Sequence, residues 1–239
     1  MTPVRGMLAE FIGTFALMFV GGGAIIMTAA LPGGGGGLLA IALAHGLILA
    51  VMITAFMHLS GGQFNPAVAI ALAVIRKQTW TQAMLFSAAQ IIGSVVAAAL
   101  LKGLFNEIRV DGMMIRAADA VQVGATLGSL GLSTGAIFIL EMIATILLMT
   151  TIMGTGVDAR GTGKSLAVGG FGIGLTVAAN ILFFGPATGA SMNPARSFGP
   201  ALIAGAWSMH WVYWLAPICG AVVAATVYKA AFGIEETAA

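Results

Sequence analysis

Six long apolar stretches, separated by short polar segments, make up most of the chain. They cover residues 6–29, 38–58, 80–104, 132–154, 165–184 and 210–232. A helix needs roughly 20 mostly apolar residues to cross the hydrocarbon core of a bilayer, and each stretch is close to that length. The pattern predicts six membrane-spanning helices in a single domain over residues 1–239.

Two shorter apolar stretches, residues 66–75 and 194–204, each follow the asparagine of an Asn-Pro-Ala triplet. They are too short to cross a bilayer as helices. Proline suits the first turn of a helix, where its missing N–H is not needed, and the asparagine before it is a favoured N-cap. We therefore predict short helices that begin at Pro66 and Pro194 and enter the membrane without crossing it.

The chain repeats itself in three blocks that occur in the same order. Residues 10–18 match 141–149, residues 65–67 match 193–195, and residues 91–98 match 218–225, and Lys102 and Lys229 extend the last match. The offsets are 131, 128 and 127 residues. We therefore predict two homologous halves, 1–105 and 132–239, joined by a polar connection over 106–131 that lies outside the membrane.

Each half holds three predicted spanning helices, so the second half enters the membrane upside down. Such halves are related by a two-fold axis in the membrane plane, which places a binding or conduction site near the midplane. The two short helices then enter from opposite faces and meet with their N-termini at the centre. Helices of this kind are tolerated only where protein buries them or where they line a wet cavity.

Composition supports lipid as the solvent and excludes several functions. The chain is 59% hydrophobic and only 8% charged, whereas soluble domains carry roughly 25% charged residues. A net charge of +2 is too small to indicate a nucleic-acid partner. One cysteine, Cys219, allows no disulfide framework or metal site. No metal cluster, nucleophile motif or phosphate loop is visible, so we expect neither an enzyme nor a cofactor.

Basic residues favour an orientation with both termini in the cytoplasm. The predicted inner segments hold Arg5, Arg76, Lys77, Arg160, Lys164 and Lys229, and the predicted outer segments hold Lys102, Arg109 and Arg116. Six against three follows the positive-inside rule. The expected location is the plasma (inner) membrane.

The two triplets carry the candidate chemistry. Paired helix N-termini concentrate positive partial charge at the midplane, and Asn65 and Asn193 can each offer a side-chain N–H to a water oxygen there. Cations, hydronium included, then meet an electrostatic barrier. One such triplet can be an ordinary N-cap, but two copies at matching places favour a pore.

The residues around these triplets resemble the signature loops of the aquaporin (major intrinsic protein) family. The two segments are His58-Leu-Ser-Gly-Gly-Gln-Phe-Asn65-Pro66-Ala67-Val68 and Gly189-Ala-Ser-Met-Asn193-Pro194-Ala195-Arg196-Ser-Phe-Gly-Pro200. The resemblance implies an all-α membrane protein, a right-handed bundle of six transmembrane helices plus two re-entrant half-helices. It also implies a homotetramer that passes water through one pore per subunit.

The resemblance implies a constriction formed by His45, Ile181, Ala190 and Arg196. A buried arginine at membrane depth is functional by default. This combination is similar to plant vacuolar-membrane aquaporins, in which ammonia, urea or hydrogen peroxide passes as well as water. Residues 105–131 lack the histidine of ammonia-selective members. Ser197 and Phe198 argue against the alternative of a dedicated glycerol or small-polyol facilitator.

Three further residues are candidates for supporting roles. Glu10 and Glu141 are the only acidic residues in the predicted spans, and we expect them to accept hydrogen bonds from the two re-entrant loops. A proton relay is the alternative for this pair. His58 precedes the first loop, and we expect it to line the inner vestibule. A secondary transporter is the more remote alternative, but it normally needs titrating groups at the midplane, where this chain offers two asparagines.

Overall fold

The computed structural model describes residues 3–161 and 168–234. Within these residues six helices are long and apolar enough to cross a membrane. They are built on α1 (Pro3–Ala30), α2 (Gly37–Ser60), α4 (Trp80–Phe105), α6 (Thr134–Ile152), α8 (Gly169–Thr188) and α10 (Val212–Phe232). The prediction of six spanning helices is confirmed. The expected start of the fifth helix at 165–167, and Lys164, lie outside the described residues.

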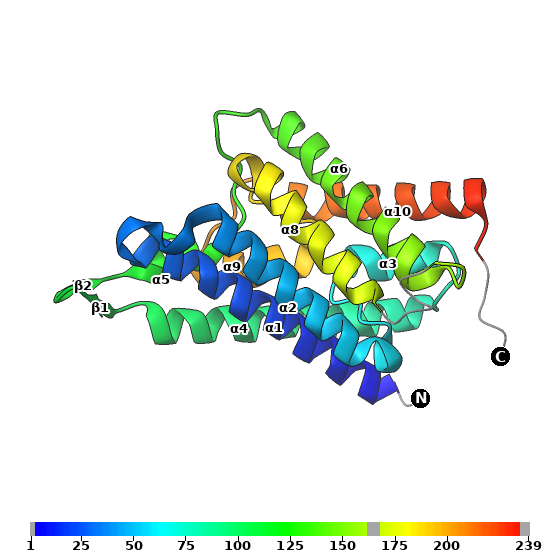
Figure 1. Ribbon diagram of the computed structural model, residues 1–239, viewed down its shortest axis with the longest axis horizontal. Helices are drawn as coiled ribbons and strands as arrows, with labels where there is room; N and C mark the ends of the chain where they lie inside the picture. Colours follow the sequence, from blue (N-terminus) through cyan, green and yellow to red (C-terminus); the bar gives the residue numbers. More distant parts are fainter. Residues whose placement is uncertain (1–2, 162–167, 235–239) are drawn as a thin grey trace.

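Two short helices lie among the spanning ones (Figure 1). These are α3 (Pro66–Val74) and α9 (Pro194–Ala204), and each begins at the proline that the sequence indicates. Asn65 and Asn193 have extended backbones, with φ of −156° and −153°, and each side chain accepts a hydrogen bond from the first turn, as an N-cap does. Most side chains of both helices are buried, so neither faces lipid along its length.

Close helix contacts recur at matching places in the two halves. Helix α4 packs on α1, α10 packs on α6, and α2 packs on α8. At Gly93 an added Cβ would lie 2.5 Å from the carbonyl oxygen of Phe11, and at Gly220 it would lie 2.5 Å from that of Met142. Glycine is therefore required where α4 crosses α1 and where α10 crosses α6.

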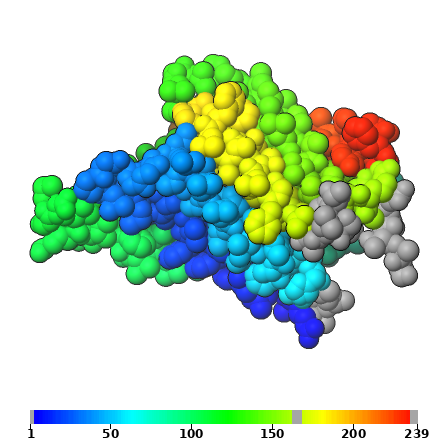
Figure 2. All heavy atoms as spheres, in the orientation of Figure 1, coloured from blue at the N-terminus to red at the C-terminus, as the bar shows by residue number. Residues whose placement is uncertain are grey.

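The connections gather at the ends of the bundle. Between α1 and α2 lies η1 (Pro32–Gly36), and α6 continues into η3 (Met153–Val157). Between α4 and α6 lie the antiparallel strands β1 (Ile108–Val110) and β2 (Met113–Ile115), then α5 (Ala117–Ala120) and η2 (Gln122–Gly124). The β-hairpin projects from one end of the bundle, whereas α1 begins and α10 ends at the other end (Figures 1 and 2).

The hairpin is a local departure from an all-helical chain. Val110 pairs with Met113 across Asp111 and Gly112, whose φ values are 48° and 81°. Two consecutive residues with positive φ form a tight two-residue hairpin turn, and Asp-Gly is a preferred sequence for it. The polarity of this segment predicts only a connection outside the membrane, and the hairpin is an addition to that prediction.

Candidate functional site

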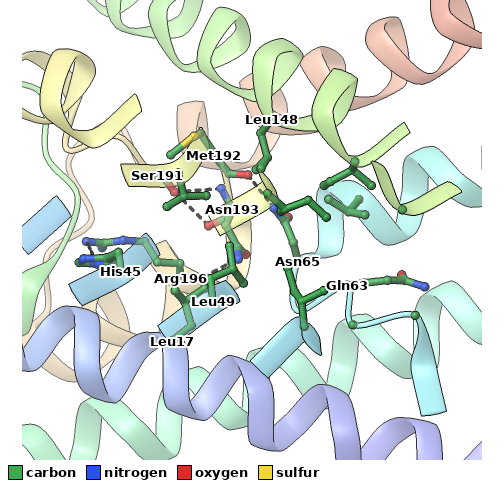
Figure 3. A pocket seen from close by; sticks show the side chains of 18 of the residues that line it. Leu17, His45, Leu49, Gln63, Asn65, Leu148, Ser191, Met192, Asn193 and Arg196 are labelled. Atoms are coloured by element: carbon green, nitrogen blue, oxygen red, sulfur yellow. Dashed lines mark hydrogen bonds between the residues drawn. The ribbon is translucent and has the colours of Figure 1, made fainter. Parts of the chain in front are cut away.

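A cavity of about 130 Å³ lies at the centre of the bundle. A water molecule needs at least about 10–15 Å³ of such space, so several can be accommodated. Most of the wall is apolar and comes from α1, α2, α3, α6 and α8: Leu17, Leu49, Ile53, Val68, Leu72, Leu148, Ile152, Ile173, Val177 and Ile181. The polar side chains lie along this apolar wall from His45 and Arg196 to Gln63, with the two N-cap asparagines between (Figure 3).

Each N-cap asparagine donates a hydrogen bond to the loop that precedes the opposite half-helix. Asn65 Nδ2 donates to the Met192 carbonyl oxygen, and Asn193 Nδ2 donates to that of Phe64, each at 2.8 Å. The Oδ1 atoms accept from the first turns of α3 and α9. A carboxamide carries two N–H donors. One N–H of each asparagine therefore holds the opposite loop, and a second is left at the cavity wall.

The loops before the half-helices share one unusual backbone conformation. Phe64 and Met192, each directly before its N-cap asparagine, have positive φ values of 48° and 52°. Non-glycine residues rarely adopt this region, which costs on the order of 1–3 kcal/mol and persists only where the surroundings enforce it. Here it lets each carbonyl oxygen accept from the asparagine of the opposite loop.

The two buried glutamates supply part of that enforcement. Glu10 accepts from the backbone N–H groups of Gln63 and Phe64 at 2.9 and 2.5 Å, and Gln90 Nε2 donates to the same carboxylate at 2.7 Å. Both Glu10 and Glu141 have no exposed surface. Each glutamate contacts one of the two re-entrant loops, as expected for residues that hold these loops in place.

Glu141 repeats this pattern in the second half. Its carboxylate accepts from the backbone N–H groups of Ser191 and Met192, both at 2.9 Å, and from Thr188 Oγ1 at 2.6 Å. The two oxygens of each carboxylate together accept all of these hydrogen bonds. A glutamine at the same position has an NH2 group in place of one oxygen, so one donor would lose its acceptor.

Arg196 lies beside His45 at one end of the cavity (Figure 3). Arg196 Nη1 donates to the Gly124 carbonyl oxygen at 2.9 Å, and Nη2 lies 3.3 Å from His45 Nε2. His45 Nδ1 lies 2.8 Å from the Ile41 carbonyl oxygen, which can only accept, so Nδ1 carries the proton and Nε2 accepts from the arginine. Within the described chain Arg196 Nε is buried with no partner.

Ile181 and Ala190 also line the cavity. Both line it together with His45 and Arg196, and all four are at most 4% exposed. Behind Arg196, hydroxyl groups connect its helix to the loops: Ser197 Oγ lies 2.6 Å from Thr126 Oγ1 and 2.5 Å from Ser191 Oγ. The four residues implied by the resemblance therefore all line the same cavity.

The other predicted residues lie at or near the cavity. Pro66, Ala67, Pro194 and Ala195 form the first turns of the half-helices and are buried. His58 is exposed in the last turn of α2 and is not among the residues that line the cavity. Gln63 lines it instead, and its amide pairs with that of Gln78 at 2.7 Å.

Two partners of the site were missed at the sequence level. Gly124 contributes a carbonyl oxygen from η2, and no side-chain pattern marks such a contact. Gln90, in contrast, is an amide side chain in the middle of a spanning helix, and that signal could have singled it out as a partner for Glu10.

Comparisons with known proteins give one consistent family. The chain matches the major intrinsic protein family over residues 1–228. Aquaporin TIP4-4 of Zea mays is 44% identical over 236 residues, which cover 96% of this chain and 87% of the relative. Aquaporin NIP3-1 of Arabidopsis thaliana is 40% identical, covering 94% and 67%. The structure of the aquaglyceroporin from Plasmodium falciparum is similar with a TM-score of 0.84 and 26% identity, covering 96% and 97%.

Proposed function

The chain belongs to the major intrinsic protein family, and from this premise we propose that it is a passive channel that conducts water through the central cavity. Proteins of this family are channels, not enzymes. The observation that carries the proposal is the pair of reciprocal hydrogen bonds at the cavity wall, from Asn65 to the Met192 carbonyl oxygen and from Asn193 to that of Phe64, between two helix N-termini.

Water passage follows from the donors at the centre. A water molecule there accepts from the remaining N–H groups of Asn65 and Asn193, so its own hydrogens point along the cavity. Most of the other side chains that line the cavity are apolar and offer it no hydrogen bonds. A cation or hydronium meets the positive ends of α3 and α9, and the described residues that line the cavity include no carboxylate to offset them, because Glu10 and Glu141 bind the loops from outside this lining. The channel therefore excludes ions and protons.

The ring of His45, Ile181, Ala190 and Arg196 selects the solutes. Arg196 has N–H bonds on Nη1 and Nη2 beyond those that Gly124 and His45 accept, whereas the acceptor nitrogen of His45 is already engaged. Small neutral molecules with an acceptor atom, including ammonia, hydrogen peroxide and urea, therefore pass together with water. Glycerol is the second candidate, favoured by the similarity to the Plasmodium falciparum aquaglyceroporin.

Stopped-flow light scattering on proteoliposomes tests this function. Vesicles with the purified protein should shrink under an osmotic gradient much faster than empty vesicles of the same lipids. Isotonic gradients of urea and glycerol then rank the solutes. Shrinkage at the rate of empty vesicles would refute a water channel, and flux that requires an ion gradient would support a secondary transporter instead.

The assembly and the membrane are part of the proposal. We propose that residues 1–105 and 132–239 are homologous inverted halves and that the protein forms a homotetramer with one pore per subunit. We also propose that it lies in the plasma membrane with both termini on the cytoplasmic side. The start of α1 and the end of α10 at one end of the bundle support the shared side of the termini. Cross-linking, protease access to the termini and fractionation against the vacuolar membrane test these points.

A further inference from the structure

Both half-helices end at a carbonyl oxygen that accepts from a lysine. Lys102 Nζ, from α4, donates to the Ile203 carbonyl oxygen in the last turn of α9 at 3.2 Å. Lys229 Nζ, from α10, donates to the Ile75 carbonyl oxygen at the end of α3 at 2.9 Å. These lysines are the pair that extends the third repeated block, so the same contact occurs once in each half.

The ends of α3 and α9 need such partners. The last carbonyl groups of a helix have no partner inside the helix, and they carry the negative end of the helix dipole. A lysine ammonium offers three N–H donors and a positive charge to that end. The contacts are therefore favourable in both hydrogen bonding and charge.

Each lysine reaches a half-helix of the opposite half of the chain. Lys102 lies in the first half and holds α9, whereas Lys229 lies in the second half and holds α3. The N-terminal ends are joined across the halves as well, through Asn65 and Asn193. Each half-helix is thus held at both ends by the other half.

We propose that Lys102 and Lys229 are positioning residues of the channel, which fix the depth and tilt of α9 and α3 and so the geometry of the cavity wall. This role rests on the proposed function. The two lysines differ in consequence, because α9 carries Arg196 whereas α3 carries no charged side chain. Lys102 therefore controls solute selection, and Lys229 controls the water path at the centre.

The test compares ratios of permeability, because a loss of folded protein lowers all fluxes in proportion. Lys102→Met keeps most of the apolar stem and removes the donor and the charge. For this variant we expect the ratio of urea to water permeability in proteoliposomes to change about two- to fivefold, the effect of losing one charge–dipole contact. Lys229→Met should lower water permeability per folded protein, with the amount of folded protein in the vesicles measured separately, and Lys229→Arg should restore it. Lys102→Arg should restore the wild-type ratio.

Two controls separate this role from surface charge. Asp119 lies 3.6 Å from Lys102 Nζ, so Asp119→Asn removes an ion pair and leaves the contact with Ile203. Arg109→Met removes one positive charge from the exposed hairpin at the same end. Both should keep wild-type ratios.

The outcomes are distinguishable. Unchanged ratios in Lys102→Met, or equal shifts in the Arg109 control, would overturn the positioning role while wild-type water flux still upheld the channel. A wild-type protein that conducts no water would overturn both. If Lys102→Met does not fold, Lys102→Gln carries the test, because it keeps an N–H donor without the charge. A smaller shift in the same ratio is then expected, and no shift would overturn the role.

Discussion

Replacing Asn193 by aspartate should turn the centre of the cavity into a cation path. Each half-helix N-terminus carries the equivalent of about half a positive charge, so α3 and α9 together place about one positive charge there. One carboxylate cancels it. At an effective dielectric constant of about 20, two unit charges about 4 Å apart interact by about 4 kcal/mol, so cation and proton leak should rise by up to about a thousandfold.

The fold should survive this change. Aspartate is as good an N-cap as asparagine and can still accept from the Ala195 N–H. The loss is the Nδ2 donor to the Phe64 carbonyl oxygen, which leaves an unpaired acceptor at a cost of about 1–3 kcal/mol. Asn193→Ser is the matched control, because it keeps a capping oxygen and also loses this donor but adds no charge.

The assay follows a pH-sensitive dye inside proteoliposomes, with the membrane potential clamped by potassium and valinomycin. An external pH of 8 lies far above the usual aspartate pKa of about 3.9, which favours the ionised carboxylate. The internal pH should change much faster in vesicles that carry Asn193→Asp than in vesicles that carry Asn193→Ser. Equal proton leak in the two variants, both still conducting water, would refute the electrostatic account of exclusion.

Three further predictions concern stability and selectivity. Glu141→Gln leaves an amide facing one backbone N–H of the loop, and should lower the free energy of unfolding by about 1–3 kcal/mol in detergent; an unchanged melting temperature would argue against bracing. Gly46→Ala places a Cβ 2.6 Å from a carbonyl oxygen of α8 and should cost about 1–3 kcal/mol, whereas Gly103→Ala meets open space and should be neutral or stabilising. His45→Phe with Ile181→His should reduce urea and ammonia flux while keeping water flux, and an unchanged solute profile would show that the constriction lies elsewhere.

The family and the helical architecture could be predicted because they depend on local patterns. Length and hydropathy indicated the spanning helices, and the Asn-Pro pairs marked where α3 and α9 begin. The ends of the helices were predicted less accurately than their number. Helix α8 continues through Pro186 to Thr188, past the expected end at residue 184. The carbonyl oxygens of Gly185 and Ala187 in this last turn accept from the N–H groups of Gly189 and Ser129.

The remaining features depend on contacts between distant segments. Arg196 donates a hydrogen bond to the backbone carbonyl oxygen of Gly124, 72 positions away in the sequence. Every residue type has such a carbonyl group, so the sequence does not indicate this contact. Lys102 and Lys229 occupy matching positions in the sequence repeat, which indicates a shared role. Only the structure shows that each lysine binds a half-helix of the other half. The Asp111-Gly112 pair favours a hairpin turn, but its polar surroundings are equally typical of an irregular connection.

The most direct test measures water and protons together in vesicles that carry the wild-type protein. Osmotic shrinkage and internal pH are followed at several temperatures after one mixing step. If water is guided past Asn65 and Asn193 while positive helix ends repel cations, shrinkage should be fast and weakly temperature-dependent, and the internal pH should stay constant. Water flux equal to that of empty vesicles, or protons that move along with the water, would contradict the account.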